Sequence, residues 1–157
     1  MLCGVHANED IPTGLFTDDA HTTRCALCQA TPLYRHYHNS EWGFPIADEG
    51  RLFEKICLEG FQAGLSWLTI LNKRETFRSA FANFDAERVA RFDASDTQRL
   101  LPRCRCPKTS RKRGWTFVGP TTMHAFMQAM GLINDTLEGC ASRQAALAAR
   151  AAFTPLR

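Results

Sequence analysis

The spacing of apolar residues, interrupted by glycines, most restricts how this chain can fold. A helical face is indicated after residue 48 by Leu52, Phe53, Ile56 and Cys57, which recur at intervals of three and four. Gly60 and Gly64 weaken one unbroken helix, because glycine costs about 1 kcal/mol relative to alanine in a helix interior. We therefore expect two helices that meet near Glu59. The second continues the apolar spacing through Leu68, Leu71, Phe77 and Phe81.

Helix signals continue along the rest of the chain. Asp48, Asp85 and Asp93 each precede residues of helical habit and are candidate N-caps. In "GPTTMHAFMQAMG", Pro120 suits a first helical turn and Gly131 suits the end. This core helix is expected to bury the stripe Met123, Phe126, Met127 and Met130. No strand pair is convincing, and "WTFVG" is the sole candidate strand, so the predicted class is all-α.

Length and composition favour one globular domain. The chain has 157 residues, of which 45% are hydrophobic and 22% charged, enough to bury a substantial core. Residues 1–23 are polar and lack periodicity, so we expect a disordered extension, and 141–157 should be a helical or loose tail. Without a long apolar run or a secretion signal, the expected protein is soluble and intracellular, in cytoplasm or nucleus.

Cysteines and histidines form the first group that could carry chemistry. The seven cysteines are odd in number and irregular in spacing, which argues against a disulfide framework. Zinc prefers thiolate and imidazole ligands, and the chain offers them at Cys25, Cys28, His36 and His38, with Cys140 far downstream. Small buried thiols beside a polar loop explain the same spacing equally simply. A basic run from 103 to 113, which includes Arg111, Lys112 and Arg113, predicts anion binding or a solvated loop.

The second group is a carboxylate among aromatic residues. Glu59 lies inside the apolar run "ICLEGFQAGLSWLTIL", where an ionised side chain must reach water or meet a specific partner. Tyr34, Tyr37, Trp42 and Trp67 lie nearby in sequence, as does Glu41. Aromatic faces with a carboxylate suit a flat cationic ring, since a cation over such a face is worth about 0.5 to 2 kcal/mol. Aromatic side chains are more often plain core, and the residues alone leave both interpretations open.

Three long segments, "YHNSEWGFP", "LFEKICLEGFQAGLSWLTILNKRETFRSAFANFD" and "FVGPTTMHAFMQAMGLINDTLEGC", resemble the DNA-3-methyladenine glycosylase I family. The resemblance covers residues 24–101 and 111–140 in the same order. It implies an all-helical fold of the helix-hairpin-helix glycosylase superfamily. It also implies base excision repair, in which the enzyme hydrolyses the N-glycosidic bond of 3-methyladenine in alkylated double-stranded DNA. A monomer that binds no membrane is expected.

The resemblance also assigns roles to individual residues. Glu59 matches the glutamate that binds the methylated adenine and is the candidate catalytic residue, while Tyr37, Trp42 and Trp67 match aromatic residues of the base pocket. Members of the family carry a structural zinc held by Cys, His, His and Cys. Here Cys25, His38 and Cys140 match three of these ligands, whereas Thr136 stands where the other histidine is expected. The resemblance leaves open whether Cys28, His36 or water replaces it, or whether the metal is missing.

A second departure from the family lies in the middle of the chain. The glycosylase-like domain is expected over 24–140, but only "PRCRCPKTS" stands where the family has a long section that includes the hairpin. The basic residues Arg111, Lys112 and Arg113 are candidates for weak phosphate contacts. Three readings follow: a working glycosylase, an inactive deleted remnant that folds around zinc and at most binds DNA, and an unrelated zinc-stapled interaction module.

Overall fold

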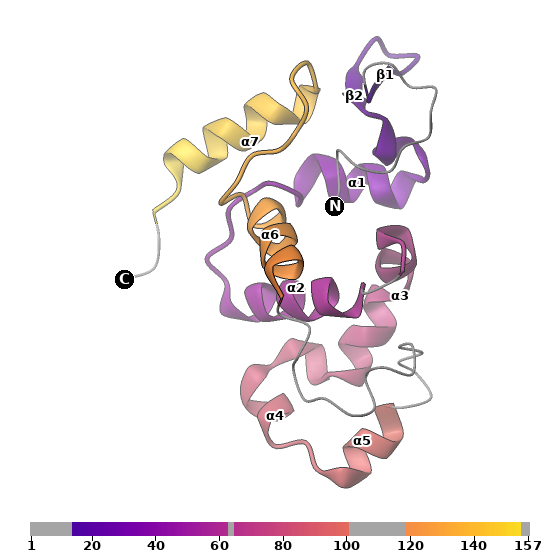
Figure 1. Cartoon of the computed structure of the whole chain (residues 1–157), viewed down its shortest axis with the longest axis vertical. Coiled ribbons are helices and arrows are strands. Elements are labelled where there is room, and N and C mark those ends of the chain that lie inside the picture. The colour runs from indigo at the N-terminus through magenta and orange to yellow at the C-terminus, as the bar shows by residue number, and fades with distance from the viewer. Residues whose placement is uncertain (1–13, 63–64, 101–118, 155–157) are drawn as a thin grey trace. The chain divides into compact units, whose positions relative to one another are not determined.

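The structure is a computed structural model that describes residues 14–62, 65–100 and 119–154. Its helices confirm the all-α class (Figure 1). In chain order the elements are β1 (Leu15–Thr17), β2 (Thr23–Cys25), the 3₁₀ helix η1 (Ala26–Gln29), α1 (Pro32–Ser40), α2 (Glu49–Phe61), α3 (Trp67–Ala80), the 3₁₀ helix η2 (Ala82–Phe84), α4 (Ala86–Ala90), α5 (Ala94–Leu100), α6 (Pro120–Ala129) and α7 (Ala141–Ala152).

The described chain divides into two compact units. The first contains the described residues up to Ala47 and those from His124 onward, so it is built from both ends of the sequence. The second contains the described residues between Asp48 and Met123. Each unit is described by itself below.

A short β-hairpin opens the first unit and corrects two expectations. Leu15 pairs with Cys25 and Thr17 with Thr23 in antiparallel register, although no strand pair was expected and 1–23 was expected to be disordered. Strands of three residues are too short to show an alternating pattern, so sequence periodicity does not reveal them. The turn is organised by Asp18, whose carboxylate accepts from the backbone N–H groups of Ala20 and Thr22.

Helices α1 and α7, which are far apart in the sequence, pack together in the first unit. The first turn of α1 is capped by Thr31, whose hydroxyl accepts from the N–H of Tyr34, and Pro32 is its first residue. The alanine-rich helix α7 packs on α1 and β2 and buries Ser142 and Ala146. Ser142 Oγ donates to Asn39 Oδ1 at 3.0 Å, which ties α7 to the end of α1.

Helix α6 begins at Pro120 and ends before Gly131, as expected. Gly131 has φ +70°, and a Cβ there would lie 2.5 Å from the carbonyl oxygen of Gly43, so only glycine fits. The expected stripe is partly wrong. The residues that α6 buries are Ala125, Gln128 and Ala129, whereas Met123, Phe126 and Met127 are half-buried. Met130, which follows the helix, is 4% exposed, so this member of the stripe is buried as expected.

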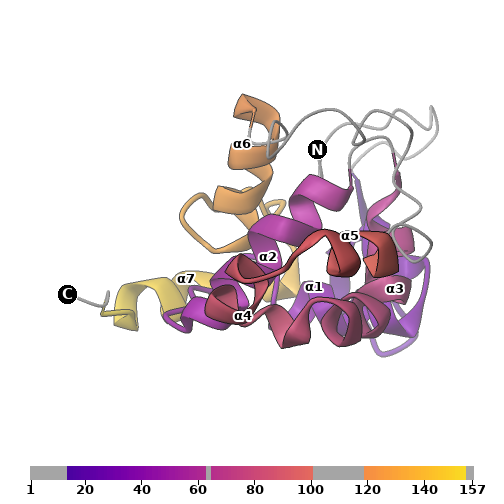
Figure 2. The same cartoon turned by 90° about the horizontal axis from the view of Figure 1, so that it is seen from below.

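The second unit is organised by α2 and α3, seen from a second direction in Figure 2. Asp48 caps α2 by accepting from the N–H of Arg51, and Ser66 caps α3 by accepting from that of Thr69. The two helices therefore meet after Glu59, as predicted. An apolar core forms where the rings of Phe61, Phe77, Phe81 and Phe84 contact one another, with neighbouring centroids 5.0 to 5.6 Å apart.

Charged residues are buried on α2 in place of part of the expected apolar face. Cys57 is buried, but Leu52, Phe53 and Ile56 are half-buried, while Glu54, Lys55 and Glu59 are 4 to 6% exposed. The short helices α4 and α5 follow, and Asp85 and Asp93 accept from N–H groups in their first turns, as predicted.

Several expectations lie outside the described residues. These are residues 1–13 of the expected extension, the candidate strand "WTFVG" apart from Gly119, the basic run with Arg111, Lys112 and Arg113, and the end of the tail. Among the described residues, no helix combines the length and hydropathy that crossing a membrane requires.

Candidate functional site

Glu59 is buried in the second unit and has a charged partner. Its side chain is 4% exposed, and its Oε1 lies 3.4 Å from the Nζ of Lys55, one helical turn earlier on α2. Burial raises the pKa of Glu59, and the attraction of Lys55 offsets only part of that rise. The carboxylate that the sequence placed in an apolar run therefore avoids water and meets a specific cation.

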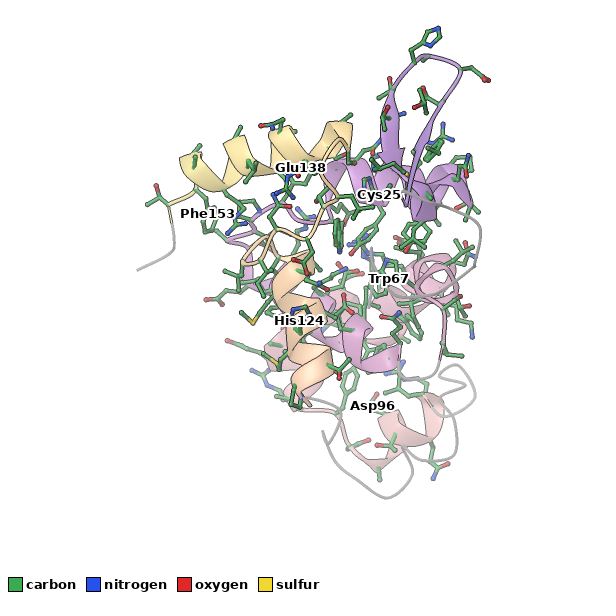
Figure 3. The ribbon with its side chains drawn as sticks, turned by 45° about the horizontal axis from the view of Figure 1, so that its top comes forward. Cys25, Trp67, Asp96, His124, Glu138 and Phe153 are labelled. Atoms are coloured by element: carbon green, nitrogen blue, oxygen red, sulfur yellow. The ribbon has the colours of Figure 1, made fainter. Side chains whose placement is uncertain are left out.

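The same ammonium lies against an aromatic face. Trp67, the first residue of α3 and labelled in Figure 3, has its ring centroid 3.9 Å from the Nζ of Lys55. The Lys55 side chain is 6% exposed, so the attraction of the ring for the cation is little screened by water. We call the Glu59 carboxylate and the Trp67 ring face the cation site. This pair of groups suits a flat, positively charged ring as well as an ammonium.

A second buried carboxylate lies one and a half turns earlier on α2. Glu54 accepts two hydrogen bonds from Arg74 at 2.9 and 3.2 Å and two from Arg78 at 2.7 and 3.0 Å. Although burial opposes ionisation, these arginine hydrogen bonds lower the pKa of Glu54. Glu54 thereby joins α2 to α3 as a fully paired anion.

The other two predicted base-binding residues belong to the first unit. Tyr37 is 4% exposed, and its ring centroid lies 6.4 Å from that of Tyr34. Trp42 is 7% exposed and stacks on the imidazole of His38, with centroids 5.8 Å apart and planes 16° apart. Glu59 and Trp67 belong to the second unit, so a base pocket lined by all four residues stays a prediction.

Three predicted metal ligands converge in the first unit. The Sγ atoms of Cys25 and Cys140 and a ring nitrogen of His38 all lie within 4.8 Å of one another, and all three residues are buried. They come from the end of β2, from α1 and from the N-cap of α7, with Cys25 labelled in Figure 3. We call them the three-ligand cluster. Tetrahedral zinc holds its ligand atoms roughly 3.5 to 3.8 Å apart, so this set fits the ion after a contraction of about 1 Å.

A neighbouring side chain orients the imidazole of His38. Its Nδ1 lies 3.1 Å from Asn39 Oδ1, which accepts but does not donate, so Nδ1 carries the proton. The lone pair of a neutral ring is then on Nε2, which lies 3.9 Å from the Sγ of Cys140. This tautomer would let His38 coordinate a metal through Nε2.

The fourth ligand position is not filled by the residue that the family pattern would supply. Thr136 is 2% exposed, and its hydroxyl faces Gly43, being 3.8 Å from where a Cβ on that glycine would lie. His36 is exposed on α1 beside Ser40. Cys28 is fully buried on η1, three residues after Cys25, and burial followed by the influence of the Cys25 and Cys140 thiols raises its pKa to about 11. Of the candidate substitutes, Cys28 alone shares the buried environment of the cluster.

Sequence reasoning missed two of these functional neighbours. Lys55 was not singled out, although a lysine four residues before a glutamate on one helix is a readable signal for a pair. Asn39 was also missed, because its role depends on a contact with Ser142 over a separation of 103 residues. The Arg111 to Arg113 run lies outside the described residues.

Comparison with known proteins identifies the family. The family model for methyladenine glycosylase matches residues 27–112 and 104–144, two segments that meet at the expected deletion. A DNA-3-methyladenine glycosylase of Haemophilus influenzae is 33% identical over 179 residues, which include 76% of this chain and 97% of that protein. DNA-3-methyladenine glycosylase 1 of Escherichia coli is 33% identical over 177 residues, which include 74% of this chain and 95% of that protein. Because these alignments are longer than the part of this chain within them, they span a gap in it.

Solved structures agree with the sequence matches. The crystal structure of a 3-methyladenine DNA glycosylase I is 34% identical, covers 75% of this chain and 98% of that one, and has a TM-score of 0.65. A Staphylococcus aureus enzyme of the same name, described for its recognition of 3-methyladenine, is 27% identical over 76% of this chain and 96% of that one, with a TM-score of 0.65. The three quoted segments, the helical fold and these matches together place the chain in the methyladenine glycosylase family.

Proposed function

We propose that this chain is a base excision repair glycosylase that hydrolyses the N-glycosidic bond of 3-methyladenine in alkylated double-stranded DNA. The observation that carries the proposal is the cation site, a carboxylate 4% exposed and an aromatic ring that both contact the Lys55 ammonium and both suit a flat cation. Relatives named DNA-3-methyladenine glycosylases, whose length the alignments span almost from end to end across the gap in this chain, support the same substrate.

The charge of the lesion explains how such a site selects and acts. Methylation at N3 makes the purine positive, so the flipped base gives the buried Glu59 a partner, whereas neutral adenine leaves that carboxylate unpaired. The same charge weakens the glycosidic bond, because the base leaves with the bonding electron pair and becomes neutral. Glu59 binds the base, and water completes the hydrolysis by bonding to the sugar carbon and releasing a proton to solvent. We name no general base.

Other contacts extend this proposal to the remaining predicted residues. Tyr37 and Trp42 supply further aromatic faces for the flipped base, and Arg111, Lys112 and Arg113 supply weak phosphate contacts. We expect the enzyme to act as a monomer on alkylated double-stranded DNA, in cytoplasm or nucleus. Support for these assignments comes from the family motifs in the sequence.

A base-release assay on purified protein tests the proposal. Wild-type protein should liberate 3-methyladenine from alkylated duplex DNA, and Glu59→Gln should lower that rate by about 100-fold or more, equivalent to about 2.7 kcal/mol. Glu49→Gln is the matched control, since Glu49 lies on the same helix but is exposed, and it should keep the wild-type rate. Equal rates for wild type and Glu59→Gln would remove Glu59 from the mechanism.

An inactive remnant is the second candidate, and the gap in the alignments favours it. The missing section is where the family carries the hairpin that holds DNA. A folded protein with a cooperative melting transition that releases no base would establish this alternative. Activity in the same preparation would exclude it.

We also propose that the first unit binds a structural zinc ion. Cys25, His38 and Cys140 would hold it, and Cys28 is the candidate fourth ligand because it is a buried thiol three residues after Cys25. The ion would join β2, α1 and α7, and so join the two sequence segments that form the first unit.

Metal analysis and Co²⁺ substitution test this second proposal. One zinc per chain is expected, and the cobalt form should show absorption typical of three thiolates and one imidazole in tetrahedral geometry. Cys28→Ser should reduce the thiolate absorption and weaken zinc binding at least about 10-fold. Cys57→Ser, which alters a buried thiol of the other unit, should leave both unchanged. Metal-free protein after purification with added zinc would overturn the proposal.

A further inference from the structure

Lys55 fills the place where a positive base would bind. Its Nζ lies 3.9 Å from the Trp67 ring centroid and 3.4 Å from Glu59 Oε1, so it uses both groups of the cation site. We propose that Lys55 is a resident cation, which a positively charged base must displace and which returns after cleavage to expel the neutral product. This inference rests on the proposed function and adds a specificity-determining residue to it.

The geometry makes occupancy by Lys55 and by a base mutually exclusive. A base stacked on an aromatic ring lies about 3.5 Å from it, which is the layer that the ammonium already occupies. A hydrogen bond from a base to Glu59 would likewise end where the Lys55 ammonium now sits. Lysine suits reversible displacement because its charge is carried on a flexible four-carbon stem, which can move the ammonium toward water.

Exchange of one cation for another preserves the local charge. Glu59 resists ionisation through its burial, and the positive charge of Lys55 partly offsets this. A methylated purine brings its own positive charge, so the carboxylate stays balanced when Lys55 leaves. Neutral adenine brings none, and displacing Lys55 for it would leave a buried anion alone. The lysine therefore raises the barrier to undamaged bases more than the barrier to the lesion.

After cleavage, the cation site favours Lys55 over the base. When the bond between the sugar C1′ and N9 breaks, its electron pair passes to the base, and the cationic purine becomes neutral 3-methyladenine. Water bonds to C1′ and gives a proton to solvent, so no positive charge remains beside Glu59. Return of the Lys55 ammonium restores the ion pair and the contact with Trp67. The released base is then the weaker of two competitors for one site.

Binding of free 3-methyladenine, measured by calorimetry on the whole chain, tests the exchange. Lys55→Met removes the charge but keeps the stem, and it should bind the neutral base about 10-fold more tightly than wild type, because no ammonium competes. Lys55→Arg keeps the charge and should stay near wild-type affinity. Lys73→Met is the matched control on α3, outside the cation site, and should also match wild type. If Lys55→Met fails to fold, Lys55→Gln carries the same expectation.

Kinetic measurements distinguish the proposed exchange from a purely structural role of Lys55. In Lys55→Met, steady-state kcat should fall about 10-fold below the single-turnover rate of the same variant, because product leaves slowly. Equal or weaker base binding by a folded Lys55→Met protein would overturn the inference, as would no binding by either protein. Wild-type protein that binds the base but releases none from DNA would refute the proposed function, and the binding ratio would still decide the exchange.

Discussion

Two glutamates on helix α2 are both buried, but the pKa of one is lowered and the pKa of the other is raised. Glu54 and Glu59 are 4 and 6% exposed, and both have cationic partners. Two arginines donate four hydrogen bonds to Glu54, and its pKa falls. One lysine at 3.4 Å accompanies Glu59, and its pKa rises.

The difference separates a structural carboxylate from a binding carboxylate. Arginine forks match a carboxylate geometrically and satisfy its lone pairs, so Glu54 has little capacity left for a ligand. A single flexible ammonium leaves lone pairs of Glu59 under-used and can move away. Burial alone therefore does not mark a functional acid, whereas the number and rigidity of its partners do.

The largest effect on stability is expected from Glu54→Ala. This change leaves Arg74 and Arg78 without their buried partner, and breaking such a pair costs about 3 kcal/mol or more. Urea denaturation should show a lower midpoint with an unchanged m-value. Glu75→Ala is the control, because Glu75 also contacts Arg78 but its side chain is 81% exposed, and its loss should cost less than about 1 kcal/mol. Equal losses for both variants would refute the distinction.

The two arginines should contribute unequally to the same cluster. The Arg74 side chain is 15% exposed and that of Arg78 is 34% exposed, so water screens the second pair more. We expect Arg74→Met to destabilise the protein by about 2 kcal/mol and Arg78→Met by about 1 kcal/mol. Melting temperatures of the two variants, measured side by side, check the order. A reversed order would mean that exposure does not control these pairs.

The pH dependence of stability should have opposite signs for the two acids. The lowered pKa of Glu54 means that its stabilisation is present above its unfolded-state value of 4.5 and is lost as pH falls through the folded value. The raised pKa of Glu59 means that ionisation destabilises the fold as pH rises from 4.5 through the folded value.

Unfolding free energies from pH 3 to 8 check this contrast. Relative to wild type, Glu54→Gln should lose stability with rising pH and Glu59→Gln should gain it, each by on the order of 1 kcal/mol. The opposite slope for Glu59→Gln would show that its ion pair with Lys55 outweighs burial.

The smallest expected effect is at Gly60, next to Glu59. A Cβ at this helical position would meet nothing within 4 Å, so Gly60→Ala should raise stability by roughly 0.5 to 1 kcal/mol through helix propensity. If a base or DNA approaches this open space, the same change should lower the base-release rate although the fold is more stable. An unchanged rate would remove Gly60 from the binding surface. Denaturation and release assays on one preparation give both values.

Local sequence signals predicted the helices well, whereas features that depend on contacts between distant residues could not be predicted. Asp48 and Asp85 act as N-caps because capping needs only the next few residues. The pairing of Leu15 with Cys25 was missed, since such short strands carry no period. At the candidate site, the isolated carboxylate of Glu59 was evident from its apolar neighbours, but its partner Lys55 was not identified. Residue type and position gave five candidate metal ligands, and the family resemblance selected Cys25, His38 and Cys140 from them.

The first unit has a consequence for synthesis on the ribosome. His38 and Cys140, which lie 3.9 Å apart, are separated by 102 residues, so the N-terminal thiol and imidazole emerge long before their partner. The second unit is continuous in sequence, whereas the first contains residues from both sides of it and cannot be completed before α7 is synthesised. The nascent chain thus carries Cys25 and His38 without Cys140 until the last helix emerges, and this interval is when a competing oxidant or metal has its best access.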